Sequence, residues 1–86
     1  MSNEIYTGLR NIFNNRFKIN LEEKDRADFN KHLLGREWGF EPRDLLYIFF
    51  DIEREFKISI PEEAIESGNF GTISSIAETI SAEIAG

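Results

Sequence analysis

The feature that most constrains the fold is a stripe of large apolar residues at helical spacing in the middle of the chain. Pro42 precedes the stripe, and proline suits a first helical position because its missing N–H would have no intrahelical partner there. The members recur every three or four residues, which places them on one face of a helix. They are Leu45, Ile48, Phe49, Ile52 and Phe56. The pattern predicts an amphipathic helix that packs this face against other helices.

Two longer segments carry the same kind of pattern. The first runs from about Asn3 to Arg16, and its expected inward residues are Ile5, Leu9, Ile12 and Phe13. The last segment follows a predicted loop at Asn69-Phe70-Gly71, and Thr72 is its expected N-cap. Its expected inward residues are Ile73, Ile76, Ala77, Ile80 and Ile84. Both segments are predicted to be helices.

A short third helix is expected to start near Ile60-Pro61 and to end at Gly68, with Ala64 and Ile65 as its apolar face. The first two helices are joined by a long polar connection over residues 17–40, in which Asn, Asp and Gly interrupt any strong period. We therefore predict an all-α fold. It is a single domain over residues 1–86, a four-helix bundle with a long first loop and a short third helix.

Composition limits the function classes. The chain has 86 residues, a net charge of −6 and no cysteine, so disulfides, thiolate nucleophiles and cysteine zinc sites are excluded. An acidic chain without a concentrated basic patch predicts no nucleic-acid ligand. No apolar stretch approaches the roughly 20 residues that cross a bilayer, and no signal peptide is visible. We expect a cytoplasmic monomer that does not bind membranes and has a protein partner.

Two sequence segments, residues 51–63 and 70–77, together resemble acyl carrier proteins. Ala27-Asp28-Phe29 also resembles a carrier segment in which a loop Phe packs inward. In that family an Asp-Ser-Leu motif opens the second helix. Counted back from Ile60-Pro61, the serine position falls on Pro42, which has no hydroxyl to bond 4'-phosphopantetheine. The resemblance thus implies an acyl-carrier-protein-like bundle, and the substitution implies that it carries no cofactor.

The start of the second helix, Arg43-Asp44-Leu45-Leu46-Tyr47, and the lengthened connection after Leu34-Gly35 resemble a narrower group. It comprises carrier-related proteins of bacterial peptide-maturation systems that lack the attachment serine. The resemblance implies a non-catalytic interaction module that docks on an enzyme of such a system or a related biosynthetic one. One alternative is a genuine acyl or aminoacyl carrier modified at a non-standard serine. A second is a structural subunit of a larger assembly.

The expected partner-binding residues lie at the start of the second helix and in the loop before it. They are Trp38, Phe40, Arg43, Leu46, Tyr47 and Phe50, and aromatic and Arg side chains dominate interface energetics. For Trp38 and Phe40 the alternative is packing onto the core. The only histidine, His32, has no clear catalytic partner in the sequence. The sequence therefore predicts neither an enzyme nor a metal site.

Overall fold

The computed structural model describes residues 2–68 and 70–85 of the chain, and in this part helices are joined by loops without any strand. The elements are α1 (Asn3–Phe17), the 3₁₀ helices η1 (Leu21–Glu23) and η2 (Arg26–Asn30), α2 (Pro42–Phe56), α3 (Glu62–Glu66) and α4 (Ile73–Ala85). The predicted all-α class, with a short third helix, is confirmed. The first helix begins at Asn3 and the second at Pro42, as predicted.

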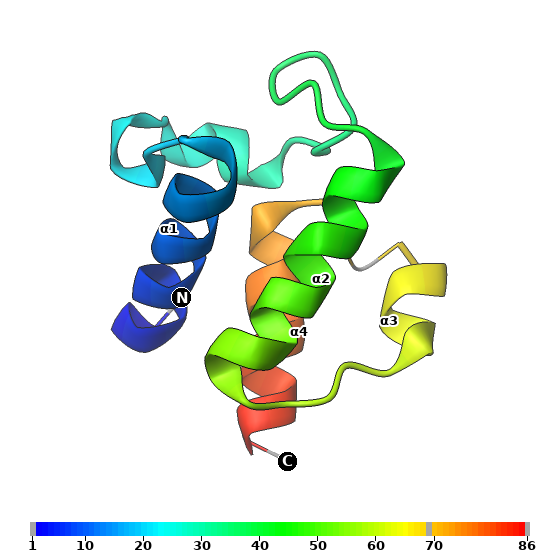
Figure 1. Cartoon of the computed structure of the whole chain (residues 1–86). Coiled ribbons are helices and arrows are strands. Elements are labelled where there is room, and N and C mark those ends of the chain that lie inside the picture. The colour runs from blue at the N-terminus through cyan, green and yellow to red at the C-terminus, as the bar shows by residue number, and fades with distance from the viewer. Residues whose placement is uncertain (1, 69, 86) are drawn as a thin grey trace.

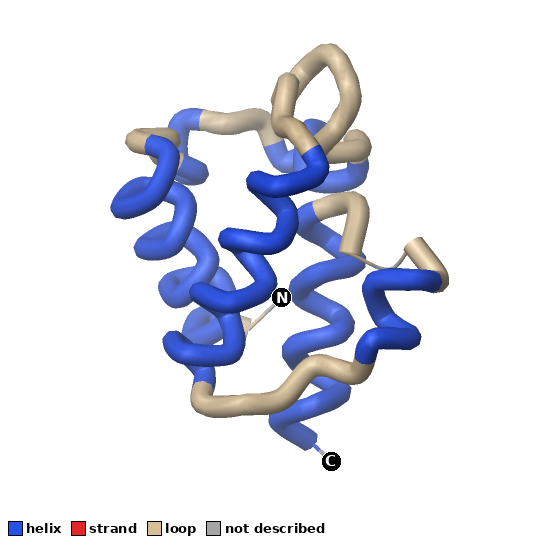
Figure 2. Tube along the Cα trace, turned by 45° about the vertical axis from the view of Figure 1, so that its right-hand side comes forward, coloured by secondary structure: helices blue, strands red, loops and turns tan. Residues whose placement is uncertain are grey.

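Figure 1 shows how the helices are arranged. Helix α2 lies in front of α4, with α1 on one side and α3 on the other, and Figure 2 shows the same order after a turn. Helix α1 contacts both α2 and α4, while η2 packs on α4. The first residue of the predicted loop, Asn69, lies outside the described residues. One hydrophobic cluster lies between these elements.

Local hydrogen bonds explain where the helices begin and end. The Ser2 hydroxyl accepts from the Ile5 N–H at the start of α1. At the start of α4, Thr72 Oγ1 accepts from the Ser75 N–H at 3.0 Å, which confirms Thr72 as the N-cap. Helices α1 and α2 each end at a lysine in the left-handed region, Lys18 (φ 59°) and Lys57 (φ 55°). That conformation turns the chain out of the helix.

The core follows most of the predicted stripes. All four inward residues predicted for α1 are buried, as are Ile48 and Ile52 of α2. The prediction was wrong for Ile84, which is 51% exposed. Figures 1 and 2 show the reason, because the last turn of α4 extends beyond the ends of α1 and α2. Ile65 is also exposed, since the single turn of α3 turns only Ala64 toward the core.

The connection between α1 and α2 is more ordered than its sequence indicates. It contains η1 and η2, whose N-cap side chains, Asn20 and Asp25, each accept a backbone N–H two residues later at 3.0 Å. Three buried side chains, Leu21, Phe29 and Leu33, anchor it to the core. The inward packing expected of Phe29 is confirmed. The connection therefore forms a packed wall of the domain rather than a free loop.

Candidate interaction surface on α2

Helix α2 presents two chemically different faces. On the inner face Ile48 and Ile52 are fully buried, and Leu45, Phe49 and Phe56 pack against the same cluster. The outer face carries residues spaced at three, four and seven positions, so they lie along one side of the helix. We call these exposed residues the outer stripe: Arg43, Leu46, Tyr47, Phe50 and Arg54.

The outer stripe contains three exposed apolar side chains in a row along the helix. Leu46 is 51% exposed, Tyr47 44% and Phe50 59%. The Phe50 ring contacts Phe49 edge-on, with ring centroids 5.5 Å apart, and its other side faces solvent. Single exposed apolar residues are common on protein surfaces, whereas a contiguous group on one helix face is typical of an interaction site.

The first turn of α2 is fixed by charged side chains rather than by a hydroxyl. The Glu41 N–H donates to Asp44 Oδ2 at 2.9 Å, and Arg43 donates to Glu41 Oε2 at 3.2 Å. The negative charge of Asp44 in the first turn also interacts favourably with the positive end of the helix dipole. Pro42 occupies the first helical position and is exposed. The residue expected to replace a modified serine is therefore at the surface and chemically inert.

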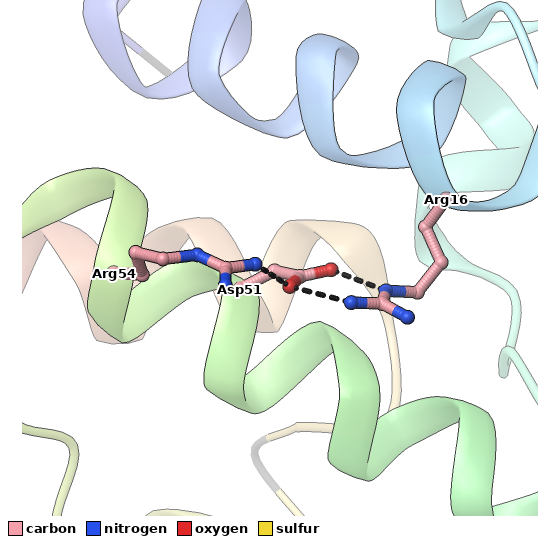
Figure 3. Close-up of polar contacts among 3 residues, drawn as sticks. All are labelled: Arg16, Asp51 and Arg54. Atoms are coloured by element: carbon pink, nitrogen blue, oxygen red, sulfur yellow. Dashed lines mark hydrogen bonds and ion pairs between the residues drawn. The ribbon is translucent and has the colours of Figure 1, made fainter.

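A buried carboxylate links α2 to α1, as Figure 3 shows. Asp51 is only 7% exposed, and its two oxygens accept from Arg16 Nε at 2.5 Å and Arg16 Nη2 at 2.9 Å. Arg54 Nη2 donates to the same carboxylate at 2.6 Å. The hydrogen bonds from Arg16, followed by the positive charges of Arg16 and Arg54, hold the pKa of Asp51 below its usual value against the opposing effect of burial.

Arg16 also orients a residue of the outer stripe. Its guanidinium lies over the Tyr47 ring, 4.8 Å from the centroid, while its N–H groups hold Asp51. This stacking is a cation–π contact, and it restricts where the exposed ring of Tyr47 can point. Part of the outer stripe is therefore pre-positioned by α1.

The two loop aromatics expected at the interface pack against the core. Trp38 and Phe40 are half-buried and pack on Phe13 of α1, with ring centroids 6.0 and 5.9 Å from it. Trp38 Nε1 also donates to the backbone oxygen of Asp28 at 2.9 Å. These contacts tie the lengthened connection to the core. Of the residues expected at the interface, Arg43, Leu46, Tyr47 and Phe50 are exposed on α2, while Trp38 and Phe40 are half-buried against the core.

His32 and Ser75 both form local hydrogen bonds. His32 Nδ1 accepts from the Leu34 N–H at 3.1 Å, and the other side of the ring lies against Gly71. Ser75 is held in the cap of α4 with Thr72. Within residues 2–68 and 70–85, no group of three or more His, Asp or Glu is placed to hold a metal ion. None of the helices in that part of the chain is long and apolar enough to cross a membrane.

The chain was also compared with known proteins. No protein family, curated protein or solved structure in these comparisons matches it.

Sequence reasoning missed the link between Arg16 and Asp51. A signal was available in part, since Asp51 follows Ile48 by three residues and precedes Ile52, which places it at the edge of the inner face. Nothing in the sequence indicates that its partner is Arg16, 35 positions earlier in the chain. That pairing depends on how α1 and α2 cross.

Proposed function

We propose that this protein is a non-catalytic, acyl-carrier-like interaction module. It docks through the outer stripe of α2 on an enzyme of a bacterial peptide-maturation system or a related biosynthetic system. The observation that carries the proposal is the exposure of Leu46, Tyr47 and Phe50 side by side on a well-packed helix. Aromatic side chains with a neighbouring Arg supply much of the binding energy at protein interfaces, because they bury a large area when water is excluded.

The start of α2 supports docking without cargo. Pro42 stands at the position where the resemblance to acyl carriers places the attachment serine. All six serines lie elsewhere. Ser2 caps α1, Ser59 lies between α2 and α3, Ser67 follows α3, and α4 contains Ser74, Ser75 and Ser81. None of them stands at the start of the second helix, where carriers bear the phosphate arm. The assignment to peptide maturation rests on the sequence resemblance alone.

Affinity purification from the source cells tests the proposal. Tagged wild-type protein is compared with Phe50→Ala, which removes the most exposed ring of the outer stripe. Ile84→Ala is the matched control, because Ile84 is similarly exposed but lies at the far end of α4. Circular dichroism should show the same helicity and nearly the same unfolding temperature for all three, since both changes remove exposed atoms.

We expect wild type and Ile84→Ala to recover a peptide-modifying or related biosynthetic enzyme, and Phe50→Ala to lose most of it. Equal recovery by all three proteins would show that α2 is not the docking helix. Recovery of fatty-acid or polyketide enzymes in place of a peptide-modifying enzyme would replace the proposal with the carrier alternative.

A further inference from the structure

A surface hollow lies between the start of α1, the 3₁₀ helix η2 and α4, and every described residue that lines it comes from these three elements. Its volume is about 440 Å³, within the range of about 300–1,000 Å³ that is typical of small-molecule sites. The buried residues of its lining are apolar, namely Ile5, Phe29 and Ala77. The rest of the lining is polar, so the hollow combines an apolar base with a polar rim.

Arg26, at the start of η2, is the cation of this rim, and two aromatic rings orient its guanidinium. Its Cζ atom lies 5.1 Å from the ring centroid of Tyr6 and 5.5 Å from that of Phe29. Within residues 2–68 and 70–85, no carboxylate lies within ion-pair distance of it. The two acids beside it in the sequence are engaged, since Asp25 caps η2 and Asp28 forms a separate ion pair. An oriented guanidinium in this state matches the two oxygens of a carboxylate.

Helix α4 contributes an acid and two hydroxyls to the same hollow. Ser74, Glu78 and Ser81 are spaced by four and three positions, so they follow one side of the helix over about 10 Å. Glu78 is exposed, and in the described part of the chain it pairs neither with Arg26 nor with another cation. Ser2 adds a third hydroxyl, which accepts a backbone N–H of α1 and keeps its own proton to donate. The rim therefore carries one cation and one anion that do not contact each other.

We propose that this hollow binds a small apolar zwitterion, namely an apolar amino acid or a short apolar peptide with free ends. The carboxylate of the ligand pairs with Arg26 and its ammonium group with Glu78, while its apolar body covers the buried base. The serine hydroxyls can both donate to and accept from peptide groups. This inference goes beyond the proposed function and does not depend on it, because the lining comes from α1, η2 and α4.

The charges of the rim disfavour simpler ligands. Phosphate or another simple anion would be repelled by Glu78, and a simple cation would be repelled by Arg26. An uncharged apolar molecule would cover the base while displacing water from both charged groups without replacing its hydrogen bonds. A ligand with both charges and an apolar body satisfies the whole lining.

An NMR titration of the full chain tests this inference, with leucine, its dipeptide and its tripeptide as probes. We expect saturable shifts of the backbone amide signals of Phe29, Ser74 and Ala77, with a dissociation constant on the order of 1 mM for the best probe. The probe that binds most tightly identifies the length of the ligand. Absence of saturable shifts with all three probes, or shifts confined to α2, would overturn the inference.

Blocked forms of the best probe test the two charge contacts. Its amide lacks the carboxylate and its N-acetyl form lacks the ammonium group, and each should bind about fivefold more weakly, as expected for one exposed ion pair. In Arg26→Gln the probe and its amide should bind equally, and in Glu78→Gln the probe and its N-acetyl form should bind equally. A variant that only loosened the hollow would weaken both ligands and keep their ratio. Persistence of the fivefold ratio in the matching variant would therefore contradict the assignment.

Lys24→Gln is the matched control for Arg26→Gln. Lys24 also lies over an aromatic ring, 5.3 Å from the centroid of Trp38, but it does not line the hollow. We expect this variant to retain the fivefold preference for the probe over its amide, and circular dichroism should show equal helicity for both variants. Loss of the preference in Lys24→Gln as well would show a general effect of charge and would overturn the contact with Arg26.

Discussion

Replacement of Asp51 by Asn tests how much the polar link between α1 and α2 contributes to stability. The carboxylate is 7% exposed and accepts three hydrogen bonds from two guanidinium groups. Asparagine has nearly the same shape but carries no charge. Its amide nitrogen is a donor, so it would face the N–H groups of Arg16 or Arg54.

The expected cost lies between two limits. Breaking a fully buried ion pair costs about 3–5 kcal/mol, whereas an exposed pair contributes about 0–1 kcal/mol. Here the carboxylate is buried, but its cations reach solvent and can regain water. We therefore expect Asp51→Asn to lower the free energy of unfolding by about 2 kcal/mol. For a domain of this size that corresponds to a fall in Tm of about 8–16 °C.

Urea and thermal unfolding followed by circular dichroism measure this difference, and its pH dependence tests the cause. The pKa of Asp51 is lowered in the folded protein, so the unfolded chain binds the proton more readily. The stabilisation is then fully present above the ordinary Asp pKa of 3.8 and declines as the pH falls through the lowered folded value. Wild type and Asp51→Asn should differ equally at pH 7 and pH 5, and converge in stronger acid.

Glu55→Gln is the control for this comparison, because it removes one negative charge from an exposed position of the same helix. It should change the free energy of unfolding by less than about 0.5 kcal/mol. A loss for Asp51→Asn as small as that of Glu55→Gln would refute the reasoning. A difference from wild type that does not change with pH would assign the loss to packing instead of charge.

Three further changes test the core and the connection, with urea unfolding as the common measurement. Phe13→Ala removes the ring on which Trp38 packs and should lower the free energy of unfolding by about 3–5 kcal/mol. A loss below about 1 kcal/mol would show that the aromatic cluster is loosely packed. Gly71→Ala places a Cβ 2.5 Å from His32 Nε2, so it should destabilise the protein, and His32→Ala should cost less in that background than in wild type. Trp38→Phe removes the hydrogen bond to the Asp28 carbonyl and should lower the free energy of unfolding by about 1 kcal/mol. Unchanged stability would show that water replaces this bond.

The helices were predictable because their signals are local. Apolar spacing, Pro42 at the start of α2 and Thr72 before α4 depend on residues within a few turns of each other. The exposed position of Leu46, Tyr47 and Phe50 follows from the same helical period, once the inner face of α2 is known.

Other features depend on contacts between distant parts of the chain. The two 3₁₀ helices were missed because their order comes from burial of Leu21 and Phe29 as well as from local caps. The exposure of Ile84 depends on where the neighbouring helices end, which the period of α4 does not encode. The contacts of Trp38 with Phe13 and of Arg16 with Asp51 depend on how the elements pack together.

We propose that this protein acts without a covalently attached cargo arm, because Pro42 stands where the resemblance to acyl carriers places the attachment serine. The most direct test is the intact mass of the protein isolated from its own cells under conditions that keep phosphodiesters and thioesters. We predict no species heavier than the polypeptide by a phosphopantetheine group, whether free or acylated. A species carrying that added mass, mapped to any serine, would contradict the account.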